Sequence, residues 1–261
     1  MLVIRLLAVC LIGAVSATAQ PPARPGRGGA VLGGIYLNSA HPDAAIAFWT
    51  DLIGASTSSR GSLQGISMIG ATILFMPNEP TGPSAGSAID NIGLHVPDLQ
   101  PVLDRLAKTA YKSFQPPGGE GRLIIDGPDG VRIELTEDNT MYAPLQFDGI
   151  QFNSPKPKEM QAWYGRVFST RPGPDDKTIS SRMAGTALIF AQADSVSPTA
   201  GRAIDHIALE IRDLENFCKK LAGDGIKFDS PYHSIPETGK ASAFLTDPWG
   251  TRIELTESLD H

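Results

Sequence analysis

An imidazole and a carboxylate occupy two short segments of this chain that alternate polar and apolar residues. His206 lies within residues 205–210 (DHIALE), and Glu254 lies within residues 252–256 (RIELT). Because successive side chains of a β-strand point to opposite faces, each segment should turn its polar residues to one surface and its apolar residues to the core. The polar residues expected on that surface are His206, Glu210, Arg252, Glu254 and Thr256.

Two interpretations of this pair are open from the residues alone. His206 and Glu254 are suitable ligands for Zn²⁺, Mn²⁺, Ni²⁺ or Fe²⁺. They could equally form a cross-strand hydrogen bond in a polar cleft that holds no metal, with Arg252 pairing to Glu254 as a sheet salt bridge. A usable metal site normally needs three protein ligands, so the third ligand decides between the two.

A second candidate region is the segment 230–240, which contains Tyr232 and His233. It is long for a strand connection, and long loops often carry function. We expect either a lid whose Tyr232 and His233 touch a ligand in the cleft or a solvated loop. No Ser-His-Asp order, P-loop or dinucleotide fingerprint accompanies these residues.

Composition excludes several classes of function. The 261 residues are 41% hydrophobic, which suffices for a core, and the net charge is −6 without any run of Lys or Arg. A nucleic-acid partner is therefore not expected. No apolar stretch after residue 20 approaches the roughly 20 residues of a membrane helix, so no stable membrane span is expected.

The N-terminus has the order of a secretory signal peptide. Arg5 precedes an apolar run over residues 6–15, and Ala17-Thr18-Ala19 matches an A-x-A cleavage pattern. We expect residues 1–19 to be removed near Ala19-Gln20 and the protein to be exported, to the periplasm or outside the cell. The alternative is a membrane anchor, for which the apolar run is short. Residues 20–33, rich in Pro, Gly and Ala, should form a flexible lead-in.

An internal repeat organises the rest of the chain. GVRIELTE at 130–137 returns as GTRIELTE at 250–257, a shift of 120. AIDNIGL at 88–94 returns as AIDHIAL at 203–209, and GIYLNS at 34–39 returns as GIQFNS at 149–154, both shifted by 115. The chain is therefore a tandem duplication, with a first domain at 34–140 and a second at 144–261.

A finer period divides each half into two units. Strand-like runs open at Gly34, Asn91, Gly149 and His206, spaced by 57, 58 and 57 residues. A helix-period segment and several short β-rich runs follow each opening run. The pattern predicts an α+β protein of four βαβββ units, in two domains.

This duplication and the runs at 204–214 and 247–257 resemble the vicinal oxygen chelate superfamily, which includes glyoxalase I, bleomycin and fosfomycin resistance proteins, and extradiol dioxygenases. The resemblance covers nearly all of the chain after the lead-in. It implies two domains, each with mixed sheets curled around a cleft. It also implies a divalent metal in the cleft, chelated by a substrate with two adjacent oxygens.

The resemblance assigns candidate ligands residue by residue. His206 and Glu254 match two ligand positions of the family. Its first-strand ligand position falls at Gly149, which has no side chain, so Gln151 on the same face is the candidate third ligand. The remaining position falls near Ile189, which is apolar. The first half retains only Glu134 and is expected to have lost any metal site.

Three functions are compatible with these residues. The first is a metal-dependent lyase or isomerase of the glyoxalase type, in which Glu254 would also be catalytic and shuttle a proton next to a carbonyl. The second is a metal-free, non-catalytic small-molecule binder of the bleomycin-resistance type, and no cofactor at all is as open as a metal. The third is a structural module whose clefts are relics; a cleft filled by side chains would favour it.

Two further expectations complete the sequence analysis. An extradiol dioxygenase is disfavoured, because its iron site needs two histidines on ligand strands and His233 is outside them. The partner is expected to be a small-molecule ligand, and the chain could be a monomer or a homodimer.

Overall fold

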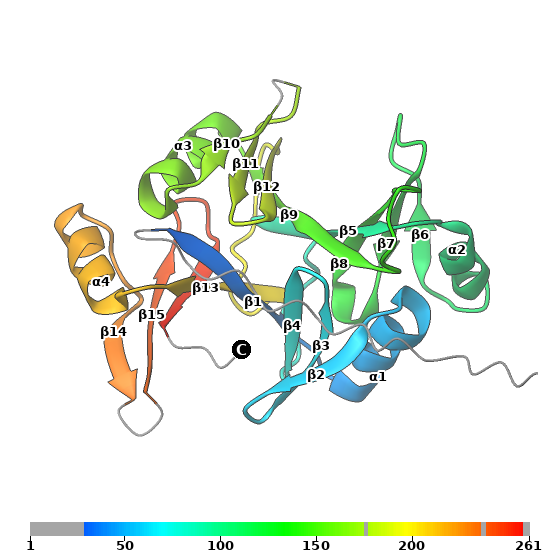
Figure 1. Ribbon diagram of the computed structural model, residues 1–261, viewed down its shortest axis with the longest axis horizontal. Coiled ribbons are helices and arrows are strands. Elements are labelled where there is room, and N and C mark those ends of the chain that lie inside the picture. The colour runs from blue at the N-terminus through cyan, green and yellow to red at the C-terminus, as the bar shows by residue number, and fades with distance from the viewer. Residues whose placement is uncertain (1–28, 175–176, 236–238, 258–261) are drawn as a thin grey trace, which may run out of the picture.

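The computed structural model describes residues 29–174, 177–235 and 239–257, which form four βαβββ units (Figure 1). The predicted α+β class is confirmed. Residues 1–19, which we predict to be a signal peptide, and residues 20–28 of the predicted lead-in lie outside the described residues. The first strand begins at Ala30, so residues 30–33, which we expected in the flexible lead-in, belong to a strand instead.

The units follow one another along the chain with the same element order. Unit 1 contains β1 (Ala30–Asn38), α1 (Pro42–Ala47), the π-helical turn η1 (Phe48–Ile53), β2 (Ser56–Arg60), β3 (Leu63–Met68) and β4 (Ala71–Met76). Unit 2 contains β5 (Ile89–Val96), α2 (Gln100–Leu106), β6 (Lys112–Phe114), β7 (Arg122–Asp126), the 3-10 turn η2 (Pro128–Gly130) and β8 (Arg132–Glu137). Unit 3 contains β9 (Gln146–Ser154), α3 (Pro157–Phe168), β10 (Arg171–Pro172), β11 (Ser180–Met183) and β12 (Thr186–Gln192). Unit 4 contains β13 (Ile204–Ile211), α4 (Leu214–Gly223), β14 (Ser230–Ile235), β15 (Lys240–Thr246) and β16 (Arg252–Glu257).

The units pair into two mixed eight-stranded sheets in a nested order. Sheet A runs β14-β15-β16-β13-β1-β4-β3-β2 and combines units 1 and 4. Sheet B runs β10-β11-β12-β9-β5-β8-β7-β6 and combines units 2 and 3. At the centre of each sheet two first strands pair antiparallel, β1 with β13 and β5 with β9. The sequence halves at 34–140 and 144–261 therefore each contribute one unit to each sheet.

The chain crosses between the sheets twice, and the two crossover segments lie side by side. Residues 77–88 lead from sheet A to sheet B, and residues 193–203 lead back. The amide of Ala203 donates to the carbonyl of Gly82 at 2.9 Å, and that of Ala88 donates to Ser197 at 2.9 Å. These backbone bonds tie the two crossings into one strap.

The helices join consecutive units, so they hold each sequence half together. In Figure 1 α3 and α4 lie at one end of the molecule and α1 and α2 at the other. Helix α3 is amphipathic, and its buried face includes Trp163 and Phe168. The Phe168 ring stacks on Phe217 of α4. At the other end, Nε of Arg105 in α2 donates to the carbonyl of Leu52 in η1, the turn that follows α1, at 2.8 Å. One hydrophobic core, built from strand and helix residues of all four units, runs through both sheets.

Sheet A is curled, as a contact between Arg60 at the end of β2 and strand β1 shows. Strands β3 and β4 separate β2 from β1, so a flat sheet would place Arg60 about 14 Å from β1. Nη2 of Arg60 nevertheless donates to the carbonyl of Gly33 at 2.9 Å. The curl turns the polar face of sheet A, the face opposite the core, inward on itself.

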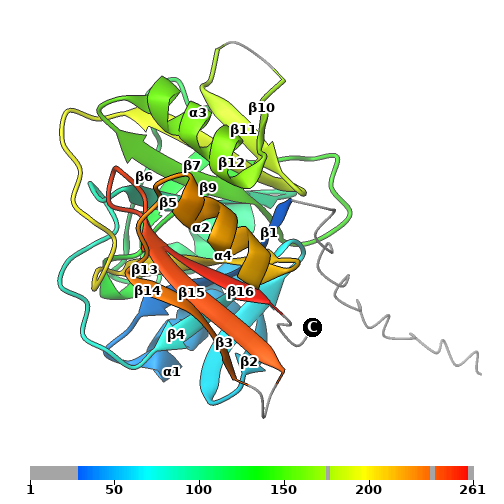
Figure 2. The same cartoon turned by 90° about the vertical axis from the view of Figure 1, so that its left-hand side faces the viewer.

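The segment that we expected to be a lid or a loop is largely an edge strand. Residues 230–235 form β14, which pairs with β15 at the edge of sheet A and lies beside α4 (Figure 2). Its register shifts between Ser230 and His233, which accommodates Pro231 at a sheet edge. Residues 236–238 lie outside the described part of the chain. None of the helices described has the length and apolar character needed to cross a membrane.

Candidate functional site

A β-bulge positions the histidine of the candidate site. His206 pairs with Tyr36 and Ile204 pairs with Leu37, so Asp205 is an extra residue in β13. A bulge breaks the strict alternation of side chains. Asp205 and His206 are consecutive, yet Oδ1 of Asp205 lies 2.6 Å from Nδ1 of His206. The Asp205 carboxylate therefore fixes the orientation of the imidazole.

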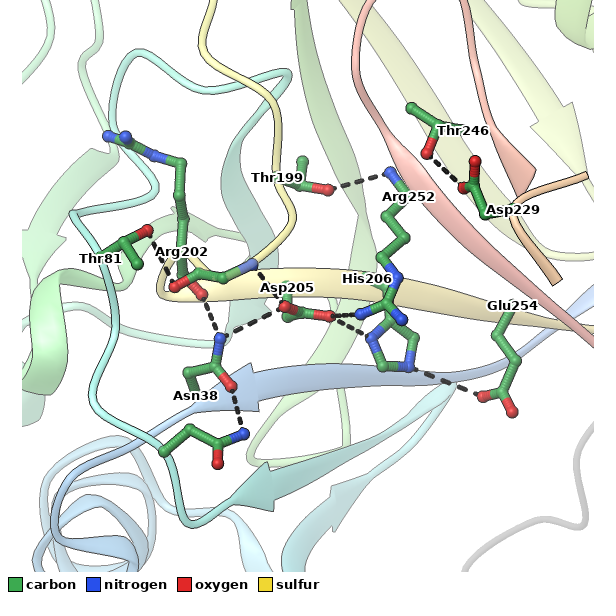
Figure 3. Close-up of polar contacts among 12 residues, drawn as sticks. Asn38, Thr81, Thr199, Arg202, Asp205, His206, Asp229, Thr246, Arg252 and Glu254 are labelled. Carbon is green, nitrogen blue, oxygen red and sulfur yellow. Dashed lines mark hydrogen bonds and ion pairs between the residues drawn. The ribbon is translucent and has the colours of Figure 1, made fainter. Parts of the chain in front are cut away.

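The other nitrogen of the imidazole faces Glu254. Nε2 of His206 lies 3.6 Å from Oε2 of Glu254, which projects from the neighbouring strand β16 (Figure 3). The His206 side chain is only 5% exposed, whereas the Glu254 side chain is 16% exposed. The structure thus brings His206 and Glu254 together, and Glu254 is the member of the pair that solvent reaches.

Asp205 is the anchor of the site. It also accepts hydrogen bonds from the Gly201 amide at 2.6 Å and from Arg252 Nη1 at 2.9 Å (Figure 3). Burial disfavours its carboxylate, but the hydrogen bonds from His206 and Gly201 and the positive charges of His206 and Arg252 outweigh burial and lower its pKa to about 2. Arg252 therefore pairs with Asp205, not with Glu254 as in the metal-free interpretation of the sequence.

The charges around His206 favour its protonated form. Burial lowers the pKa of the imidazole, but hydrogen bonds to Asp205 and Glu254 and the charges of both carboxylates outweigh burial and raise it. His206 is thus an imidazolium candidate held between two carboxylates.

Aromatic rings enclose the imidazole. Tyr36 of β1 stacks on His206 with ring centroids 4.3 Å apart and planes 14° apart, and Phe244 of β15 packs edge-on at 5.5 Å. Burial and the charge of Glu254 raise the pKa of Tyr36, against the opposing effect of the adjacent Arg60 guanidinium. Beyond Tyr36 the face is apolar and filled, since Tyr36, Leu74 and Ala208 form a buried cluster.

Sheet B repeats the network around Asp205 without the histidine. Asp90 stands at the corresponding bulge of β5, and it lies 3.8 Å from Arg132 and 3.0 Å from Nδ2 of Asn153. Asn91 occupies the position of His206. An Asp–Arg–Asn network shared by both sheets is a device for joining units, whereas the histidine is particular to sheet A.

The equivalent of Glu254 is also engaged differently in sheet B. Glu134 of β8 is paired with Arg122 of the neighbouring strand β7. In sheet A the position equivalent to Arg122 is occupied by Ser242 of β15. Ser242 pairs with Thr256, and Arg122 pairs with the equivalent threonine, Thr136. Glu254 has no such arginine and faces His206 instead.

Gln151 does not join His206 and Glu254. It lies in β9 of sheet B and is registered with Asn91 of β5. Its prediction as a third ligand assumed that units 3 and 4 share a sheet, and the nested pairing separates them. The residue that meets His206 from a first strand is Tyr36 of unit 1.

The remaining residues selected from the sequence are dispersed. Thr256 donates to Glu210 Oε2 at 3.1 Å, further along the polar face. Tyr232 packs against the core, on the opposite face of sheet A. His233 is exposed, with Nε2 at 3.2 Å from Ser242 Oγ. None of these four residues touches the His206–Glu254 pair in the hydrogen bonds of the described residues.

Comparison with known proteins identifies the family to which the segment around this site is similar. A family model described as the Glyoxalase/Bleomycin resistance protein/Dioxygenase superfamily matches residues 148–255, which include His206 and Glu254. Residues 148–255 belong to that superfamily. The resemblance drawn from the sequence is thereby confirmed. No curated protein matches the chain in sequence.

Solved structures share the fold over most of the chain. Glyoxalase I from Zea mays shares 14% identity, covering 87% of this chain and 92% of its own, with a TM-score of 0.70. A candidate dioxygenase from Bacillus subtilis shares 15% identity, covering 88% and 86%, with a TM-score of 0.65. At such identities the likeness establishes the fold alone.

The metal that the superfamily implies does not fit the residues of sheet A. Tyr36 and Leu74 stand where unit 1 would supply further ligands, and Leu74 is fully buried in an apolar cluster. No group of three His, Cys, Asp or Glu side chains suited to a metal occurs among the described residues. Two donors fall short of the three that a stable site needs.

Proposed function

We propose that the chain is a metal-independent small-molecule-binding protein of the glyoxalase superfamily and that its site is the polar face of sheet A around His206 and Glu254. The observation that carries the proposal is the Asp205–His206–Glu254 row, in which one carboxylate orients the imidazole and the other faces solvent. A fixed imidazole beside an accessible carboxylate is a polar anchor of the kind that ligand sites use.

Each residue has a distinct part in this site. Glu254 accepts hydrogen bonds from the ligand, and His206 holds the Glu254 side chain in place by charge. Phe244 and Tyr36 provide ring surfaces on either side, with the Arg252 guanidinium 4.7 Å above the Phe244 ring. The combination suits a small, partly planar ligand with a hydrogen-bond donor.

A structural role is the second candidate, and one observation favours it. Leu74 and Ala208 are fully buried and Tyr36 nearly so, which means that side chains fill the polar face where units 1 and 4 meet. If the filling extends over His206, the network would only join units 1 and 4. A lyase or isomerase that depends on metal has less support, because the donor set stops at two.

One substitution gives sheet A the residue that sheet B has at the equivalent position, and it distinguishes the ligand-binding role from the structural role. His206→Asn installs the residue that sheet B carries at Asn91 and keeps the bulge. We expect small molecules from a fragment set, observed by saturation-transfer NMR, to bind the wild type and to bind H206N and Glu254→Gln at least tenfold more weakly. Equal binding to all three proteins would refute the site, and no binding at all would favour the structural role.

A metal-retention experiment separately tests the proposal that the site holds no metal. After loading with Zn²⁺, Mn²⁺, Ni²⁺ or Fe²⁺ and desalting, we expect far less than one equivalent by elemental analysis. One tight equivalent that is absent from both His206→Ala and Glu254→Ala would contradict the proposal.

We also propose that the protein is exported. This proposal rests only on the signal-peptide pattern in residues 1–19, namely a basic residue, an apolar run and an A-x-A site. Expression of the full chain with its own N-terminus should give a product that begins at Gln20, read by N-terminal sequencing of the periplasmic or secreted fraction. An intact Met1 in the cytoplasmic fraction would contradict export.

A further inference from the structure

Arg60 is a cation without an anion. Three arginines on the polar faces have carboxylate partners, since Arg122 pairs with Glu134, Arg132 with Asp126 and Arg252 with Asp205. No carboxylate pairs with Arg60 within the described part of the chain. Its Nη1 is buried and makes no hydrogen bond to any described residue.

The position of Arg60 is built by the backbone around it. Nη2 donates to the Gly33 carbonyl at 2.9 Å, which draws the guanidinium over β1. A Cβ at Gly34 would lie 3.1 Å from Nη1, so the glycine leaves the guanidinium room against the strand. The curl of sheet A therefore holds the cation over the polar face instead of leaving it in solvent at the edge strand.

The side chains around Arg60 indicate which class of ligand could pair with its guanidinium. The Tyr36 hydroxyl oxygen accepts a hydrogen bond from the Arg60 guanidinium, and its own O–H, which is protonated at neutral pH, remains a second donor. The half-buried side chains Leu63 and Met76 pack with Tyr36 and Leu74 next to it. A guanidinium beside a phenol matches a carboxylate, and the apolar side chains match a hydrocarbon body.

We propose that Arg60 and Tyr36 form an anion subsite for a small monocarboxylate, placed next to the His206–Glu254 pair. This rests on the proposed binding function and names its ligand class. The negative charge of Glu254, which reaches Tyr36, opposes a dianion such as phosphate and so favours a single negative charge. A buried N–H without a partner is stabilised when a carboxylate oxygen accepts its hydrogen bond.

The test uses sodium propionate as the probe, with propionamide as its neutral counterpart and inorganic phosphate, at a pH above its second pKa, as the dianion. We expect millimolar propionate to shift the backbone amide signals of Gly33 and Gly34 in NMR spectra of the full chain. Propionamide should cause no such shift and phosphate a weaker one. Affinity for propionate should fall at least tenfold in Arg60→Gln and stay unchanged in Arg182→Gln, an exposed arginine on the polar face of sheet B.

Because Arg60 also ties β2 to β1, a second variant guards against a folding defect. Tyr36→Phe removes only the hydroxyl and should weaken propionate binding several-fold. Equal affinity in the wild type and R60Q would overturn the subsite, as would phosphate binding more tightly than propionate. If propionate fails while fragments still bind in a manner sensitive to His206→Asn, the subsite is wrong and the proposed function stands. If neither binds, both are wrong.

Discussion

Asp205 and Asp90 show how one residue changes the use of a repeated network. Both carboxylates sit at a bulge, and each contacts an arginine of its own unit and an asparagine of the paired unit. Only Asp205 has a histidine beside it, and only there does the neighbouring strand leave the glutamate without an arginine. The candidate site is thus a structural junction to which His206 was added.

At this scale we predict a pH dependence of stability set by Asp205. Its pKa of about 2 lies below the unfolded value of 3.8, so its ionisation stabilises the fold above about pH 4 and the contribution is lost as pH falls toward 2. The contribution amounts to roughly 2 kcal/mol. Urea unfolding across pH 2–7 should show this loss in the wild type.

The Asp205→Asn variant should be less stable at pH 7 and should lose less stability between pH 4 and pH 2. Breaking a buried ion pair costs about 3–5 kcal/mol. Asp194→Asn, at an exposed position, is the control and should follow the wild-type curve. A curve for D205N that parallels the wild type would show that the carboxylate is not the origin of the pH dependence.

At the scale of elements, the strands and units could be predicted but their neighbours could not. Alternation in residues 252–256 assigns each side chain a face, and Ile253 and Leu255 are indeed fully buried. Alternation does not say which strand lies alongside, so Gln151 was assigned to the wrong sheet. The bulge at Asp205 and the contact of Arg60 with β1 depend on pairing and curl, and no local pattern in the sequence carries them.

Two equivalent glycines give a matched test of how tightly each sheet is packed. Gly34 and Gly149 are related by the 115-residue shift. A Cβ at Gly149 would collide with the Ala187 carbonyl oxygen of β12, whereas a Cβ at Gly34 meets the flexible end of Arg60. Gly149→Ala should destabilise the protein by about 1–3 kcal/mol, as overpacking does, and Gly34→Ala by less than about 1 kcal/mol. Chemical denaturation of both variants measures the difference, and a larger effect at Gly34 would contradict the account.

At the scale of the whole molecule, the nested pairing makes the two sequence halves interdependent. Residues 146–257 contain units 3 and 4, which belong to different sheets. Expressed alone, this half would expose β9 and β13, each missing its central partner. Long unpaired strand edges drive association.

We therefore predict that residues 146–257 do not fold as a monomer, although they contain all of the residues that match the superfamily model. Size-exclusion chromatography with multi-angle light scattering should show dimers, in which units pair between copies, or aggregates. Residues 87–200, which hold both units of sheet B, are the comparison fragment. A monomeric 146–257 with a cooperative unfolding transition would contradict the prediction.

The nesting also sets an order in time. Units 2 and 3 are neighbours along the chain, so sheet B closes over a short loop, whereas Tyr36 must find His206 across most of the sequence. Longer loops close at greater entropic cost, and distant contacts form late. Pulse-labelled hydrogen exchange should protect β5 and β9 before β1 and β13, and simultaneous protection would contradict this order. A chain still being synthesised cannot yet bring Tyr36 and His206 together, because the candidate site is complete only once the last unit has returned to the first.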